Sequence, residues 1–267
     1  MHFLQGTISY PEVKWGTAEE RAVRNTPLVD FVDKLADVGA DGIELWGRHL
    51  ENLGEAEVEA LAGAIKASSQ KVEMLAPYWD FSSSDEAVEK SLGDAHEYLR
   101  IKDIFNCNRI RVFTGAPASA EATEQNWQRA LKGMNELARM YDGTGVTFVV
   151  ETHGDQLADT PESCRRLMEE LDEPSVRLNY QQMGGAPSDE LDLIYPWVSH
   201  VHVSRTSRFP EKAEAVIKEL VLRGYDGTVT VEFCTDSLPG ENEQFDLDRA
   251  IAGMTADIKL LRALAGS

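Results

Sequence analysis

Ionisable side chains stand where a strand-like run of the sequence ends. The run Val146–Val150 is apolar or β-branched throughout and stops at Glu151-Thr152-His153. Residues two apart in a strand lie on one face, so Glu151 and His153 are expected to point the same way. A carboxylate and an imidazole in that position could transfer protons or bind a cation.

Two more strand-like runs carry ionisable residues near their ends, and these are His202 and Glu232. With Glu151, and with a donor oxygen after the run Ser175–Tyr180, they could surround one divalent cation. Carboxylate-rich sites with one imidazole suit Mn²⁺, Mg²⁺ or Co²⁺ better than structural zinc. A single Glu at a strand end could instead form a structural ion pair. Three such residues at matching strand ends favour a shared site.

Other residues near the strand ends could contact a substrate. Trp46 and Trp79 follow strand-like runs, where they could wall a pocket or simply cap the core. His200 lies deeper in its run than His202, which favours a hydrogen-bonded core residue or one that supports the ligands. Aromatic rings beside carboxylates and amides are typical of pockets for polyhydroxylated ligands.

Strand-like and helical patterns alternate along the whole chain. The predicted strands are Phe3–Ser9, Asp41–Trp46, Lys71–Ala76, Arg109–Phe113, Val146–Glu151, Ser175–Tyr180, Val198–Val203 and Thr228–Phe233. The predicted helices are Thr26–Ala36, Glu55–Ser68, Ser83–Phe105, Ala120–Tyr141, Thr160–Leu171, Asp189–Ile194, Glu211–Leu222 and Leu247–Leu264.

Eight strands alternating with eight helices predict an α/β fold, a single (β/α)8 TIM barrel over residues 1–267. An open doubly wound sheet is the alternative, but neither a G-x-G-x-x-G nor a P-loop motif is present. In such barrels the active site lies at the carboxyl ends of the strands, where Glu151, His202 and Glu232 are expected.

Composition narrows the classes of partner. The formal net charge is −20, which argues against nucleic acid and anionic membranes. No apolar run approaches the ~20 residues of a membrane span, and the amino terminus lacks signal-peptide features. Three cysteines are too few for a disulfide scaffold. We therefore expect an acidic cytoplasmic protein with free thiols, no membrane association and a small-molecule, carbohydrate-like substrate.

Four segments resemble the xylose isomerase-like TIM-barrel superfamily of sugar phosphate isomerases and epimerases. They are Gly42–Gly47, Glu151–Thr160, His200–Val203 and Val231–Phe233. Carried over from ketose 3-epimerases, the resemblance implies a metal site of Glu151, Gln181 (or Asn179), His202 and Glu232. It implies Mn²⁺, with Mg²⁺, Co²⁺ or Zn²⁺ as alternatives. Dimers or tetramers are common among such relatives, so a homo-oligomer is possible here.

The same resemblance implies roles in catalysis. Glu151 and Glu232 would act as acid and base, the metal would stabilise an enediolate, and Arg208 would contact the substrate. Glu151-Thr152-His153, followed by Leu157-Ala158-Asp159-Thr160, also resembles bacterial 3-dehydroshikimate dehydratases, and there His153 is the candidate base.

One position departs from the epimerase pattern, because the segment after Ser175–Tyr180 has Gln181 where a carboxylate is expected. An amide oxygen can bind a hard cation but contributes no charge.

The sequence as a whole is interpreted as a metal-dependent isomerase or epimerase of a sugar, keto-sugar or polyol. The alternatives are a lyase or dehydratase of the 3-dehydroshikimate or 3-keto-sugar type, and a non-catalytic sugar-binding barrel.

Overall fold

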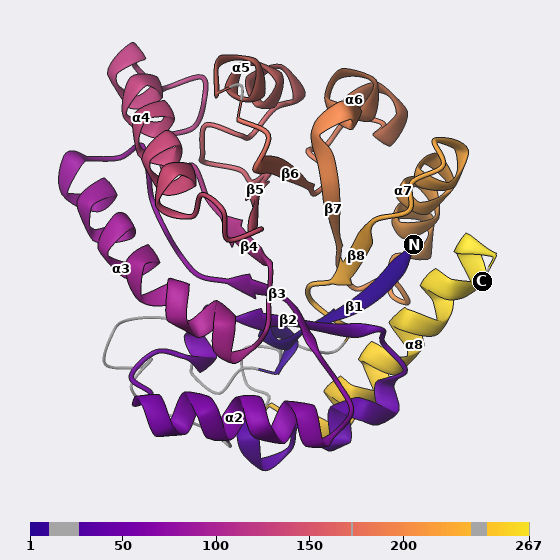
Figure 1. Ribbon diagram of the computed structural model, residues 1–267. Coiled ribbons are helices and arrows are strands. Elements are labelled where there is room, and N and C mark those ends of the chain that lie inside the picture. The colour runs from indigo at the N-terminus through magenta and orange to yellow at the C-terminus, as the bar shows by residue number, and fades with distance from the viewer. Residues whose placement is uncertain (11–26, 172, 236–244, 267) are drawn as a thin grey trace. The chain divides into compact units, whose positions relative to one another are not determined.

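A closed barrel of parallel strands forms the centre of the fold. The computed structural model describes residues 1–10, 27–171, 173–235 and 245–266 (Figure 1). Within this part of the chain the strands follow one another around the barrel in sequence order. They are β1 (His2–Gly6), β2 (Gly42–Trp46), β3 (Val72–Ala76), β4 (Arg109–Val112), β5 (Thr147–Glu151), β6 (Val176–Tyr180), β7 (Val198–Val203) and β8 (Thr228–Val231).

Helices connect the strands, as the alternating pattern predicts. They are α2 (Glu55–Ala67), α3 (Asp85–Ile104), α4 (Glu124–Met140), α5 (Pro161–Leu171), α6 (Pro187–Ile194), α7 (Pro210–Leu222) and α8 (Leu247–Ala265). The prediction of a (β/α)8 TIM barrel is therefore confirmed, and no strand boundary among β1–β8 is off by more than three residues.

The chain divides into two compact units, each with its own packing. Unit 1 comprises Met1–Glu73 and His202–Ser267, and unit 2 comprises Met74–Val201. In unit 1, β1 pairs with β2 and with β8, and α8 packs on β1 and α7. In unit 2, β4 pairs with β5 and β5 with β6, while α3 packs on α4 and α5 on α6 (Figure 1).

The first predicted helix is wrong over its described residues. Thr26 lies outside them, and from there to Ala36 the chain forms 3-10 turns, Leu28–Asp30 and Lys34–Val38, instead of an α-helix. Residues 28–38 contain three valines and three aspartates, which are weak helix formers. Gly39 then ends the segment at φ 80°, a conformation that favours glycine.

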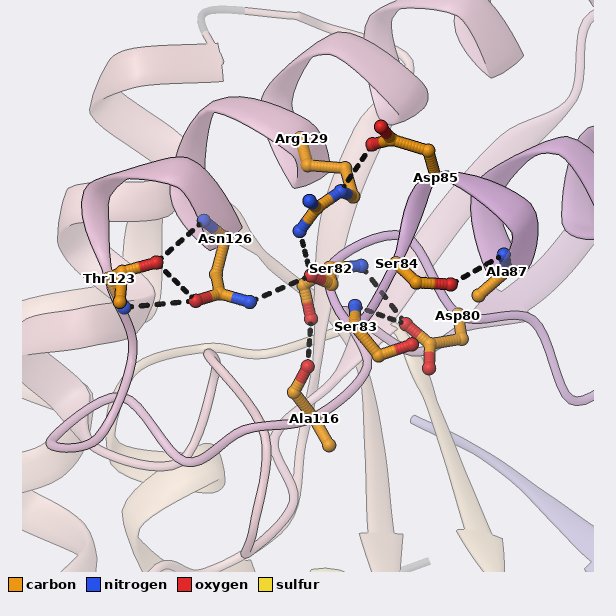
Figure 2. A network of polar contacts seen from close by, with 10 residues as sticks. All are labelled: Asp80, Ser82, Ser83, Ser84, Asp85, Ala87, Ala116, Thr123, Asn126 and Arg129. Carbon is orange, nitrogen blue, oxygen red and sulfur yellow. Dashed lines mark hydrogen bonds and ion pairs between the residues drawn. The ribbon is translucent and has the colours of Figure 1, made fainter.

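Polar contacts fix the segment that follows β3 (Figure 2). Oδ1 of Asp80 accepts hydrogen bonds from the N–H groups of Ser82 and Ser83, and each of the two distances is 3.0 Å. The carbonyl oxygen of Ser82 accepts hydrogen bonds from Asn126 and Arg129 of α4. The loop that carries Tyr78 and Trp79 is thereby tied to the helix layer of unit 2.

Capping explains where α3 and α4 begin (Figure 2). The Ser84 hydroxyl accepts a hydrogen bond from Ala87 N–H, and Thr123 and Asn126 form a reciprocal capping box. The Arg129 guanidinium also binds Asp85 in the first turn of α3 and holds the pKa of that carboxyl below its usual value. Both helix starts are thus set by local sequence.

No helix in the described ranges is long and apolar enough to cross a membrane.

Candidate active site

An imidazole of unit 1 lies between two carboxylates. Nε2 of His202, on β7, lies 2.9 Å from Oε2 of Glu44, the third residue of β2. Nδ1 of the same ring lies 3.9 Å from Oε2 of Glu232, which follows β8 directly. His202 and Glu44 are buried, and Glu232 is partly buried. We call these three residues the histidine corner.

Backbone contacts hold Glu232 in this corner. Its N–H donates to the carbonyl of Val203, and its carbonyl accepts a hydrogen bond from the Ser9 hydroxyl at 2.8 Å. A Cβ on Gly6 would lie 3.0 Å from the same carbonyl oxygen, so the two backbones approach as closely as a glycine allows. The backbone of Glu232 is therefore held by Gly6, Ser9 and Val203.

The donors of the histidine corner fit a divalent cation. A neutral imidazole carries a proton on one nitrogen, and the contact with Glu44 places that proton on Nε2. Nδ1 then presents its lone pair toward the side of the ring where Glu232 lies. Ligating histidines commonly donate their other N–H to a carboxylate, which fixes the ring and raises its basicity. Oxygen and imidazole donors of this kind suit Mn²⁺ or Mg²⁺.

Unit 2 holds a carboxylate of a different kind. Glu151 ends β5, and its Oε2 lies 3.5 Å from Nε of Arg111 on β4. Both side chains are buried. Nη2 of Arg111 donates to the carbonyl of Ala76, whereas Nε and Nη1 have no hydrogen-bond acceptor among the described residues. We call Glu151 and Arg111 the arginine corner.

A row of rings extends from the arginine corner. The guanidinium carbon of Arg111 lies 4.0 Å from the ring centroid of Phe113 and 4.8 Å from that of Tyr78. Phe113 also packs edge-on against His153, with ring centroids 5.6 Å apart. Tyr78 is 39% exposed, so one face of this row reaches solvent. One phenylalanine therefore contacts both a buried cation and an exposed imidazole.

His153 does not continue the strand that carries Glu151. β5 ends at Glu151, and the N–H of His153 donates instead to the carbonyl of Ala158. As a result Glu151 is buried while His153 is exposed. Nδ1 of His153 lies 2.7 Å from the carbonyl of Gly154. Because a carbonyl only accepts, Nδ1 carries the proton and Nε2 is left as the basic nitrogen.

The segment after β6 carries Gln181, the predicted neutral ligand. The Thr152 hydroxyl accepts a hydrogen bond from the N–H of Gln181 and donates one to the Gln181 carbonyl, and each of the two distances is 2.8 Å. Gln181 is partly buried. Asn179, the alternative ligand, is fully buried inside β6 and pairs with Glu151 in the strand register. The partly buried position at the strand end favours Gln181.

The two tryptophans expected to line a pocket are buried. Trp46 contacts His49 edge-on and packs with Ile8 and Phe233 in unit 1. Trp79 packs edge-on against Tyr98 of α3 in unit 2. Their role in substrate binding stays a prediction, and Tyr78 is the more accessible ring of unit 2.

The other two predicted substrate contacts differ in accessibility. His200 is fully buried and stands opposite Asn179 in the register of β6 and β7. Arg208 is exposed, with its guanidinium carbon 5.6 Å from the ring centroid of Phe209. A substrate could reach Arg208 directly, whereas His200 can act only through its neighbours.

The cysteines are not candidates for nucleophilic catalysis. Cys107, Cys164 and Cys234 are free, as predicted, and all three are buried. Burial, with a smaller contribution from the charge of Asp159, raises the pKa of the Cys164 thiol far above its usual value. That thiol is therefore neutral and unreactive at physiological pH.

Sequence reasoning assigned no role to Glu44 or Arg111. Glu44 lies inside the Gly42–Gly47 motif, and Arg111 lies between the buried Ile110 and Val112 of β4. A charged residue within a strand of a parallel barrel is unusual, because both faces of such a strand are covered. That signal could have identified both residues.

Comparison with known proteins agrees with this architecture. The xylose isomerase-like TIM barrel family matches residues 32–263. The 3-dehydroshikimate dehydratase of Bacillus anthracis is 28% identical over 188 residues, which cover 67% of each protein.

Solved structures share the fold over nearly the whole chain. A crystal structure of the probable 3-DHS dehydratase of Bacillus anthracis has a TM-score of 0.71 and 23% identity, covering 98% of both chains. A D-psicose 3-epimerase crystallised in the presence of D-fructose has a TM-score of 0.77 and 16% identity, covering 100% of both chains.

Proposed function

Because this chain belongs to the xylose isomerase-like TIM-barrel family, we propose that it is a metal-dependent dehydratase of the 3-dehydroshikimate type. The substrate would be a keto-polyol that carries a carboxylate. The observation that carries this proposal is the arginine corner and its row of rings. A buried guanidinium whose Nη1 makes no hydrogen bond to a described residue, one ring away from a basic imidazole, suits an anionic substrate beside a general base.

The proposed metal ligands are Glu151, His202 and Glu232, with the amide oxygen of Gln181 as the fourth. The carboxyl ends of all eight strands share one face of a TIM barrel, which supports combining residues from β5 to β8. A bound Mn²⁺ would supply positive charge to stabilise the oxyanion that forms when a carbon beside a carbonyl loses its proton. Two carboxylates and two neutral donors leave such a site without net charge.

The protein groups would then perform an elimination. Arg111 would bind the substrate carboxylate through Nη1, with Nε beside Glu151, and hold the ring against Phe113. Nε2 of His153 would take the proton next to the ketone, and the C–H electron pair would form the enolate. The hydroxyl group two carbons from the ketone would leave with a proton returned by His153, so that one water is lost and a conjugated double bond forms.

Ultraviolet absorbance tests this proposal directly. Purified protein loaded with Mn²⁺ and given 3-dehydroshikimate should develop the absorbance of a conjugated product, and a chelator should abolish the signal. His153→Gln should lower the rate by about 100-fold or more, in line with the loss of a general base. His96→Gln, an exposed histidine of α3, is the matched control. No absorbance change with the wild type would overturn the proposal.

The second candidate is a sugar isomerase or epimerase, the function that the sequence placed first. It is favoured by the two glutamates at strand ends, Glu151 and Glu232, because epimerisation needs an acid and a base. Incubation of D-psicose and D-fructose in D2O separates the two candidates. Deuterium incorporation without loss of water supports epimerisation. If no chemistry occurs and sugars only raise the melting temperature, the protein is a sugar-binding barrel.

A further inference from the structure

A buried carboxylate holds the loop that follows β6. Glu190 lies in the first turn of α6 and is only 3% exposed. Its Oε2 accepts a hydrogen bond of 2.7 Å from the Tyr180 hydroxyl, and its Oε1 accepts one of 2.7 Å from Gly185 N–H. Both oxygens lie within 3.2 Å of Met183 N. Three donors from the loop and its strand thus converge on one side chain.

The loop sequence is adapted to this carboxylate. A Cβ on Gly185 would lie 3.0 Å from Oε1 of Glu190, so a larger residue would press on the carboxylate. Gly184 has φ 110°, a conformation that other residues rarely adopt. An ionised carboxylate only accepts hydrogen bonds, which matches the three donors around it. The backbone conformation of residues 183–185 therefore depends on the Glu190 carboxylate.

The other end of the loop is held independently. The Thr152 hydroxyl bonds both backbone groups of Gln181, and Tyr180 lies immediately before it. Gln181 thus stands between two anchors, one from the end of β5 and one from α6. Its backbone has little freedom on either side.

We propose that Glu190 is a positioning residue that holds the β6–α6 loop so that the Gln181 amide oxygen is directed at the metal. This rests on the proposed function, in which Gln181 is a metal ligand. A neutral amide binds a cation more weakly than a carboxylate, so its contribution depends more on being held in place before binding. Preorganisation removes the entropy cost of ordering the ligand.

A double-mutant cycle on metal affinity tests this role. The affinity for Mn²⁺ is measured by electron paramagnetic resonance of the free ion for wild type, Glu190→Gln, Gln181→Ala and the double variant. Glu190→Gln should weaken binding by about 10- to 100-fold, as for other supporting residues of metal sites. In the Gln181→Ala background the same change should have almost no further effect, because Glu190 acts through Gln181. Asp189→Asn, exposed in the same turn, is the matched control.

Hydrogen exchange gives a second readout that does not need metal. The amides of Met183 and Gly185 should exchange faster in Glu190→Gln than in Asp189→Asn. Should Glu190→Gln fail to fold, Tyr180→Phe removes one of the three donors and should weaken Mn²⁺ binding roughly threefold, the size of one net hydrogen bond.

The outcomes separate this role from the proposed function. Unchanged Mn²⁺ affinity in folded Glu190→Gln, or an equal loss in both backgrounds, overturns the positioning role and leaves the dehydratase proposal intact. A wild-type protein that binds no Mn²⁺ overturns both.

Discussion

The histidine corner and the arginine corner both contain buried glutamates, but the partner of the carboxylate differs in kind. In the histidine corner, Glu44 and Glu232 share the imidazole of His202. In the arginine corner, Glu151 lies beside a guanidinium that stays protonated at any physiological pH. Buried carboxylates need such partners because desolvation of an unpaired charge costs several kcal/mol.

This difference suggests a division of tasks. An imidazole can be neutral and bind a cation through Nδ1, so the histidine corner suits a metal. A guanidinium is never a ligand for a cation, but its N–H groups can bind an anion, so Arg111 suits a substrate carboxylate, whereas its partner Glu151 is a proposed metal ligand. The predictions below test whether the two corners separate in this way.

The largest expected effect is in the histidine corner. His202→Gln should lower Mn²⁺ affinity at least about 100-fold, because it removes a direct ligand rather than a supporting residue. Titration with Mn²⁺, followed by metal analysis of the dialysed protein, measures the loss. A variant that keeps wild-type affinity would show that His202 has only a structural role.

A matching change in the arginine corner should act on substrate and stability instead. Arg111→Met should raise the KM for 3-dehydroshikimate about 100-fold, without lowering Mn²⁺ affinity. It should also lower the free energy of unfolding by about 3 kcal/mol, because Glu151 loses its buried partner. Arg165→Met breaks an exposed ion pair of α5 and should cost less than about 1 kcal/mol in urea unfolding. Equal costs for both variants would contradict a buried pair.

Glu44 should show an intermediate effect. In Glu44→Gln the amide oxygen can still accept the N–H of His202, so Mn²⁺ affinity should fall only about 10-fold, whereas Glu44→Ala should approach about 100-fold. Glu51→Gln, on an exposed side chain beyond β2, is the control. If Glu44→Ala binds Mn²⁺ like the wild type, the tautomer of His202 is set by something else.

The smallest expected effect on the free energy of unfolding concerns the partly exposed ion pair of Asp41 and Arg262. Burial alone would raise the pKa of Asp41, but hydrogen bonds from Arg262 and Phe3 N–H outweigh it and hold the pKa below its usual value. The stabilisation is therefore complete above the unfolded pKa of about 3.9 and disappears as pH falls through the lower folded pKa. Because Asp41 is largely exposed and solvent screens the pair, Asp41→Asn should cost less than about 1 kcal/mol at pH 7 and progressively less toward pH 3 in urea unfolding. A cost that grows on acidification would contradict this sign.

Local sequence was sufficient for most elements of the fold. β5 was predicted to within one residue of its observed bounds, Thr147–Glu151, because strands of a parallel barrel are covered on both faces and read as apolar runs. Residues 28–38 resisted prediction, because an apolar pattern that alternates with aspartates fits a helix as well as a series of 3-10 turns. In this segment the low helix propensity of valine and aspartate favours the 3-10 turns over an α-helix.

The candidate site could be predicted from the sequence only in part. Glu151, His202 and Glu232 were predicted because each lies at or beside the carboxyl end of a strand, and a barrel gathers strand ends on one face. The metal site that they would form stays a prediction, as do the substrate contacts. His153 was expected to share a face with Glu151, but β5 ends between them and the loop turns its side chain to solvent.

The sequence by itself determined that this chain forms a barrel of eight strands whose ends carry glutamates and histidines. The periodicity of apolar residues and the types of residue at strand ends are visible in the sequence, and they are sufficient to predict the strands and the residues near their ends. Only the tertiary structure decided which charges are partners. The pairing of Arg111 with Glu151 depends on the register of β4 against β5, and that of His202 with Glu44 on residues 158 positions apart. Such contacts are fixed by packing in three dimensions, which no local pattern encodes.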